Sequence, residues 1–172
     1  MSSKRGYDGI MTTLPLPGLN EEETDSWLAL IGTTMWLPAA LDLQLQRDAG
    51  ISHFEYGVMS ALVRQPKQTM RMKVLARATN SALSRLSRVI DRLEKQAWVE
   101  RRPDPEDGRV TLAVLTREGR RKVASATPGH IATVRALVFD RLSPDQIREL
   151  GVTLGTVVEA AGPDGACASR LT

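Results

Sequence analysis

Residues 83–115 have the sequence LSRLSRVIDRLEKQAWVERRPDPEDGRVTLAVL, in which a helical pattern is followed by an alternating one. Apolar side chains first recur at intervals of three and four, which predicts one buried stripe on a helix from about residue 80 to residue 96. The stripe consists of Leu83, Leu86, Val89, Ile90 and Leu93. Residues 98–102 and 110–115 then alternate with period two, and turn-forming residues lie between them, so the stretch continues as a β-hairpin.

Capping signals on both sides of this stretch predict further helices. Asn20 and Ser52 each precede a glutamate by three residues, which is the spacing of a capping box, and each begins a predicted helix. Pro38 lies inside the first of them, so that helix either kinks there or divides into two shorter helices. The residues predicted to cap the remaining helices are Thr69, Thr116 and Ser143.

The resulting order is helix, helix, short helix, helix, hairpin, helix, helix. This order predicts a mainly α fold with a small β-hairpin wing, which is the winged helix-turn-helix arrangement. The predicted divisions are an extended N-terminal arm (1–19), a single domain (20–161) and a flexible tail (162–172). Within the domain, the winged lobe (52–116) is flanked by N- and C-terminal helices (20–48 and 117–161).

The positive charge of the chain is concentrated in its middle. The net charge is only +3, but residues 64–122 contain sixteen Lys or Arg and seven Asp or Glu, a local charge of +9. The segments before and after carry a net negative charge. This distribution predicts a module that binds a polyanion such as double-stranded DNA.

Other features of the sequence exclude several classes of protein. Cys167 is the single cysteine, so neither an intrachain disulfide nor a cysteine zinc cluster can form. We find no nucleophile–base pairing, phosphate-binding glycine loop or metal-ligand spacing, so we expect no enzymatic activity, no cofactor and no metal. No unbroken run of apolar residues reaches the roughly 18–20 of a membrane span, so we expect a cytoplasmic protein without a membrane partner.

Polar side chains on the helix over 80–96 predict a surface that enters the major groove. Short hydroxyls allow the helix to approach DNA closely, and arginines reach guanine acceptors or phosphates. The candidate DNA-binding residues are Ser81, Ser84, Arg85, Ser87, Arg88 and Arg92. Arg92 lies far enough along the helix to favour the DNA backbone. The alternative for all six is an ordinary solvated helix face, against which the local charge and the downstream hairpin argue.

The hairpin loop predicts a wing. Arg109 near its tip carries a guanidinium that can enter the minor groove, where the electrostatic potential is negative. Asp107 is placed to fix that guanidinium by a charge-assisted hydrogen bond, and Gly108 to permit the backbone geometry between them. The alternative is an ordinary Asp-Gly turn followed by an incidental arginine.

Four segments in fixed order carry a resemblance to a known family. They are the helix LSRLSRVIDRLEK (83–95), the strand VERR (99–102), the loop DPEDGR (104–109) and the helix start LTREG (115–119). Their combination resembles the core signature of the MarR family, and the flanking helices extend the likeness to about residues 20–160. The chain departs from the pattern at Ala97, where the family has glycine, and at Pro38 in the first helix.

The resemblance implies a homodimer whose flanking helices dimerise and whose winged lobes bind a pseudo-palindromic operator, usually to repress transcription. The same face and wing also allow a non-specific architectural DNA-binding protein, which is the alternative. Many members of the family release DNA when a small aromatic or anionic effector binds beside the dimer helices. Residues with suitable chemistry for such a pocket are Trp27, Trp36, His53 and Phe54, although large apolar residues at helical spacing more often form core.

Overall fold

The computed structural model describes residues 15–161, so the predicted tail and most of the predicted arm lie outside the described residues. The chain divides after Ala40 into two units, and each is described by itself. Helix α1 (Glu21–Ala49) is one helix with Pro38 inside it, so the alternative of two shorter helices is wrong. The predicted capping box begins it: Asn20 Oδ1 accepts from the amide of Glu23, and Glu23 Oε2 accepts from the amide of Asn20, both at 2.9 Å.

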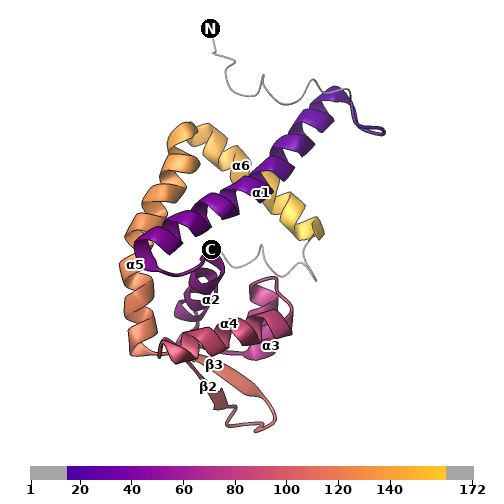
Figure 1. Cartoon of the computed structure of the whole chain (residues 1–172). Coiled ribbons are helices and arrows are strands. Elements are labelled where there is room, and N and C mark those ends of the chain that lie inside the picture. The colour runs from indigo at the N-terminus through magenta and orange to yellow at the C-terminus, as the bar shows by residue number, and fades with distance from the viewer. Residues whose placement is uncertain (1–14, 162–172) are drawn as a thin grey trace. The chain divides into compact units, whose positions relative to one another are not determined.

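Three helices form the helical part of the lobe: α2 (His53–Val63), α3 (Met72–Ala78) and α4 (Leu83–Lys95) (Figure 1). The second predicted capping box is also present, because the Ser52 hydroxyl accepts from the amide of Glu55 and the Glu55 carboxylate accepts from the amide of Ser52. The buried side chains that join these helices come mainly from α2 and α4, and they include Val58, Met59, Leu62, Leu75, Leu86, Ile90 and Leu93.

A three-stranded antiparallel sheet closes the lobe, with the order β1-β3-β2. The predicted hairpin is confirmed as β2 (Val99–Pro103) and β3 (Thr111–Leu115). The sequence did not predict β1 (Thr69–Arg71), which follows the short 3₁₀ helix η1 (Pro66–Gln68). The prediction that Thr69 caps the third helix is wrong, because Thr69 pairs with Val114 of β3 and the helix begins three residues later.

The predicted buried stripe of α4 is correct at four positions and wrong at the fifth. Leu86, Val89, Ile90 and Leu93 are buried, whereas Leu83 is 44% exposed. Leu83 is the first residue of α4, at the edge of the stripe and about one turn before its first buried residue, Leu86. The helix also begins later than predicted, because Asn80 has a φ of 44° and cannot be part of it.

Helices α5 (Arg117–Leu137) and α6 (Pro144–Ala161) are the last two helices of the described residues, with the short 3₁₀ helix η2 (Phe139–Arg141) between them. The turn before β2 places Ala97 at a φ of 55°, the left-handed conformation that glycine adopts at lower cost. The first turn of α5 lies against this turn. An added Cβ on Gly119 would be 2.0 Å from the carbonyl oxygen of Trp98, so the close approach requires glycine.

We predict that Gly119→Ala lowers the free energy of unfolding by about 1–3 kcal/mol or more, because backbone and Leu115 must move to admit the methyl group. Urea titration followed by circular dichroism measures the change. Gly57→Ala in α2 is the matched control, because its Cβ would meet nothing within 4 Å and alanine favours the helix. Equal stability of the two variants would contradict the packing described here.

Candidate nucleic-acid interface

The outward face of α4 presents two side chains that are free to bind a ligand. Ser84 and Arg88 are exposed, and the side chain of neither makes a hydrogen bond or ion pair with the rest of residues 15–161. Ser81 lies just before the helix, is partly buried, and has its hydroxyl 3.2 Å from that of Thr79. The buried stripe on the opposite side fixes this face outward, as a groove-binding helix requires.

Two of the predicted DNA-binding arginines are held by the first turn of α2. The guanidinium carbon of Arg85 lies 4.5 Å from the ring centroid of Phe54, a cation–π contact. Nε of Arg92 donates to Oε1 of Glu55 at 3.0 Å, while the other oxygen of the same carboxylate caps α2. Glu55 therefore stabilises the start of α2 and the end of α4 together. Sequence reasoning missed both contacts, because they join residues more than thirty positions apart.

Ser87 is engaged by a wing strand. Nη2 of Arg101 donates to the backbone oxygen and to the hydroxyl of Ser87, both at 3.0 Å. The same guanidinium forms ion pairs with Asp91, at 2.8 Å, and with Glu94. Arg101 was not among the predicted site residues. It ties strand β2 to helix α4 through these four guanidinium contacts and through its backbone amide, which donates to Oε1 of Glu94 at 2.8 Å. We assign it to positioning, because its charge is already neutralised by two carboxylates.

The wing loop is shaped by two aspartates. Asp104 is buried and accepts from Nε of Arg71 at 2.8 Å and from the amide of Glu106 at 3.0 Å. These two donors, the amide first, outweigh burial and hold the pKa of Asp104 below its usual value. Asp107 accepts from the backbone amide of Arg109 at 3.0 Å, so the contact is with the backbone and not with the predicted guanidinium.

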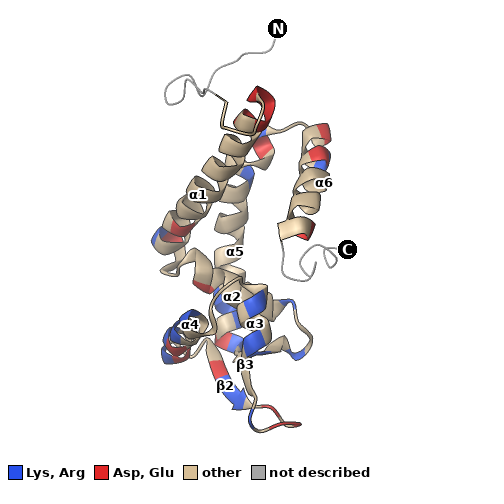
Figure 2. Cartoon of the chain, turned by 90° about the vertical axis from the view of Figure 1, so that its right-hand side faces the viewer, with Lys and Arg blue, Asp and Glu red and all other residues tan. Residues whose placement is uncertain are grey.

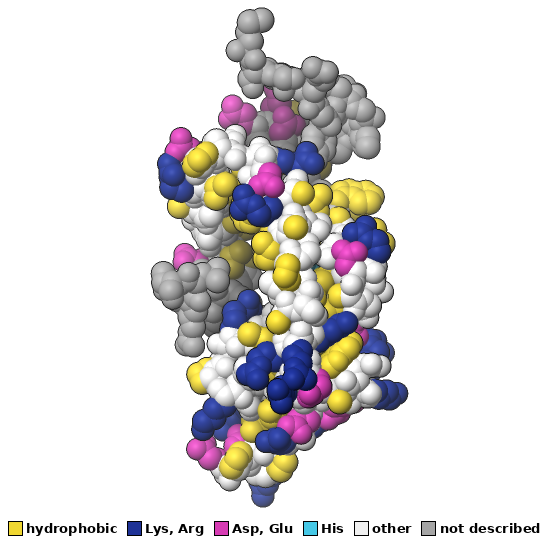
Figure 3. Space-filling model, turned by 90° about the vertical axis from the view of Figure 1, so that its left-hand side faces the viewer, with side chains coloured by type: hydrophobic (Ala, Val, Ile, Leu, Met, Phe, Trp, Pro, Cys, Tyr) yellow, Lys and Arg dark blue, Asp and Glu magenta, His cyan; other side chains and the backbone are white. Residues whose placement is uncertain are grey.

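The remaining wing residues also differ in detail from expectation. Gly108 does not have a positive φ, and a Cβ there would meet nothing within 4 Å, so its geometry does not require glycine. Arg109 is exposed, and its guanidinium has no ion-pair partner within residues 15–161. In the ribbon of Figure 2, positions occupied by Lys and Arg are blue on α3, α4 and the hairpin. The space-filling view in Figure 3 shows dark-blue Lys and Arg side chains in the lower part of another face.

The residues predicted to line an effector pocket are divided between the two units. Trp27 and Trp36 belong to residues 15–40 and are exposed, whereas His53 and Phe54 begin α2 in the other unit. The buried ring of His130 lies beside that of His53, with 5.8 Å between the two centroids. The His130 centroid is also 4.5 Å from that of Tyr56. Burial, and then the neighbouring His53, lower the pKa of His130. Cys167 lies outside the described residues.

Comparisons with known proteins place this geometry in a family. A MarR family model matches residues 49–110. Sco3205, a MarR family transcriptional regulator from Streptomyces coelicolor solved in complex with DNA, is 40% identical, with 86% of this chain and 96% of Sco3205 covered and a TM-score of 0.80. AbsC, a second such regulator from Streptomyces coelicolor, is 31% identical, with 83% and 96% covered and a TM-score of 0.78.

The similarity extends beyond Streptomyces. The uncharacterized HTH-type transcriptional regulator YdcH of Bacillus subtilis (strain 168) is 28% identical over 107 residues, which is 62% of this chain and 67% of YdcH. Helices α3 and α4 with the β2–β3 hairpin define a winged helix-turn-helix DNA-binding protein. The chain belongs to the MarR family of transcriptional regulators, a family of DNA-binding proteins and not of enzymes.

We predict that Arg101→Ala lowers the free energy of unfolding by about 1.5–3 kcal/mol, because Asp91 and Glu94 lose their charged partner and Ser87 loses its donors. Arg102→Ala is the control, since the Arg102 side chain is exposed and, among residues 15–161, forms an ion pair only with Glu100 of its own strand. That variant is expected to stay within about 0.5 kcal/mol of the parent. If both variants unfold at the same urea concentration, Arg101 does not tie the wing to α4.

Proposed function

We propose that this protein is a sequence-specific transcriptional repressor that binds a pseudo-palindromic operator as a homodimer in the cytoplasm. One observation carries the proposal. Ser84 and Arg88 on α4, together with Arg109 on the wing, are exposed and unpaired within residues 15–161, whereas Arg71, Arg92 and Arg101 of the lobe are paired with carboxylates. Unpaired donors at a groove-binding helix and a hairpin tip are what base and phosphate recognition needs.

The contacts of the predicted site residues divide their proposed roles. Ser81, Ser84 and Arg88 contact base edges in the major groove, and Arg85 joins them from its position over Phe54. Ser87 and Arg92 hold α4 in place through their protein partners, with Arg92 still exposed enough to approach a phosphate. In the wing, Arg109 enters the minor groove, and Asp107 and Gly108 form the turn that presents it.

Competition binding tests sequence specificity. We expect the protein to bind a duplex selected from a random pool at least about 10³-fold more tightly than random duplex at roughly 150 mM salt. Arg88→Ala should reduce that ratio by relaxing preference at one base pair, and Arg109→Ala should weaken binding by about 1–3 kcal/mol. Arg148→Ala on α6 removes the same charge and serves as the control. Equal affinity for selected and random duplexes would favour the architectural alternative.

Exposed apolar side chains support the homodimer. Trp36 and Val152 are 75% and 74% exposed in the single chain. Others of this kind are Trp27 and Met35 in α1, and Leu154, Val157 and Val158 in α6. By length and composition alone, α1 would also be apolar enough to cross a membrane. A second copy of the chain would cover the exposed apolar side chains of both α1 and α6, because exposed apolar faces of this kind are typical of subunit interfaces.

We predict that the double variant Trp36→Asp/Val152→Asp raises the dimer dissociation constant by at least about tenfold, because two charges would be buried unpaired in the interface. Sedimentation velocity over a concentration series measures it. Val74→Asp, an equivalent change on the lobe, should leave the dimer intact. Monomeric parent protein, or parent protein that floats with phosphatidylglycerol vesicles, would refute the assignment of these faces.

Release of DNA by a small aromatic or anionic effector is the second part of the proposal. The residues offered for it remain Trp27, Trp36, His53 and Phe54. The neighbourhood of His53 supports a polar ligand, because Nδ1 of His130 and Oε1 of Gln44 are buried without a hydrogen-bond partner among the described residues. A thermal-shift screen of aromatic acids identifies the effector, and a hit that leaves operator binding unchanged counts against release.

A further inference from the structure

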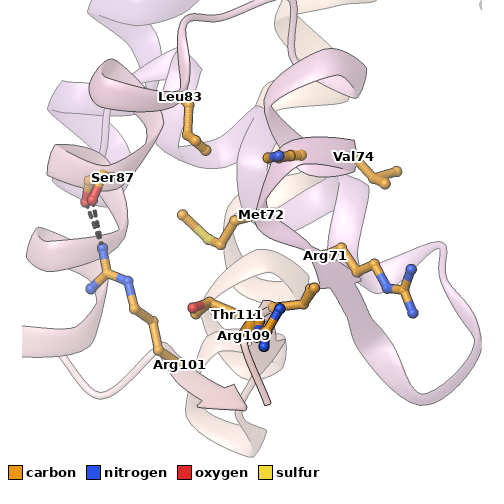
Figure 4. Close-up of a pocket in the computed structure, with 10 residues that line it drawn as sticks. Arg71, Met72, Val74, Leu83, Ser87, Arg101, Arg109 and Thr111 are labelled. Carbon is orange, nitrogen blue, oxygen red and sulfur yellow. Dashed lines mark hydrogen bonds between the residues drawn. The ribbon is translucent and has the colours of Figure 1, made fainter. Parts of the chain in front are cut away.

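An apolar hollow of about 550 Å³ lies between α3, α4 and the wing hairpin. Its floor is formed by Met72 and Val74 of α3, Leu83 of α4 and Val110 of the hairpin. Figure 4 shows the side chains of Met72 and Leu83 pointing toward one another across it. Ser87 and Arg109 also line the hollow, but the roles proposed above give no function to its apolar residues.

The floor of the hollow is unusually exposed for its composition. Val74 is 50% exposed and Leu83 is 44% exposed. Both are apolar residues that line the hollow together with charged side chains. Such apolar groups are favourably buried when a partner covers them. The partner must therefore present apolar surface to the floor.

The rim of the hollow is basic, but only part of its charge is free. Arg71 is paired with Asp104, and its guanidinium points away from the floor in Figure 4. Arg101 is neutralised by Asp91 and Glu94. Lys73 and Arg109 make no ion pair with any group in residues 15–161. A partner that fits this hollow is therefore apolar where it meets the floor and anionic where it meets Lys73 and Arg109.

The position of the hollow identifies that partner. The hollow separates α4, which is placed for the major groove, from the tip of the wing, which is placed for the minor groove. What separates a major from a minor groove in a duplex is always one sugar–phosphate backbone, and its deoxyriboses are apolar while its phosphates are anionic. We propose that the hollow binds the backbone of one DNA strand, with deoxyribose on Leu83 and Val74 and a phosphate on Lys73, while Arg109 at its rim reaches on into the minor groove.

This assignment rests on the proposed function, and it gives Leu83 a role that carries no sequence information. The competing role for an exposed leucine at the start of α4 is contact with a thymine methyl group in the major groove. The two roles differ in their signature. A backbone contact weakens binding to every sequence alike, whereas a methyl contact changes preference at one base pair.

Leu83→Ala and Lys73→Gln in the full-length protein test the proposal on a duplex selected by the parent protein and on random duplex. Leu83→Ala is expected to weaken binding to both by about threefold to tenfold, without changing base preference. Lys73→Gln should weaken both and reduce the slope of log affinity against log salt by about one. Arg148→Gln is the charge-matched control and should change neither. Thermal unfolding checks that Leu83→Ala is folded.

Neutral methylphosphonates, placed singly along the selected duplex, locate the contact. One or two positions should cost the parent protein affinity and cost Lys73→Gln nothing further. Parent-like binding by both variants overturns the proposal, and so does a changed base preference in Leu83→Ala. If the parent shows no sequence preference, the proposed function fails by itself. The uniform loss on random duplex then still decides whether the hollow binds backbone.

Discussion

Everything on the DNA-facing side of this protein depends on the burial of one stripe of α4. Leu86, Ile90 and Leu93 are almost fully buried, and they pack with α2 residues such as Met59 and Leu62. A rotation of α4 about its axis would expose this stripe and turn Ser84 and Arg88 toward protein. The apolar contacts thus fix the outward face, and the polar contacts around it, from Glu55 and Arg101, fix its two flanks. The side chains that remain free to contact DNA, such as Ser84 and Arg88, lie on the outward face between these flanks.

The division of the arginines into paired and unpaired groups follows from that arrangement. Arg71, Arg92 and Arg101 each contact a carboxylate of another element, so they contribute to holding the lobe together. Arg88 and Arg109 have no such partner within the described residues. The sequence alone gives all five the same character, and only the fold separates structural charge from charge available to a polyanion.

Local signals made much of the fold predictable. Two capping boxes, the helical spacing of α4 and the period-two pattern of the hairpin each depend on residues close together in sequence, and each is confirmed. The features that were missed depend on distant partners. Strand β1 is three residues long and exists through pairing with residues 112–114, and the groups that hold Arg85 and Arg92 come from α2. Leu83 carries the right spacing for the core but lies one turn before it.

The contact between Gly119 and the Trp98 carbonyl has a mechanical consequence. With no room for even a methyl group between them, the start of α5 cannot slide past the turn that connects α4 to β2. A displacement of that end of α5 therefore has to carry α4 and the hairpin along with it. In the proposed homodimer, each lobe would then move as a rigid body, so that the distance between the two α4 helices changes while the internal structure of each lobe stays the same.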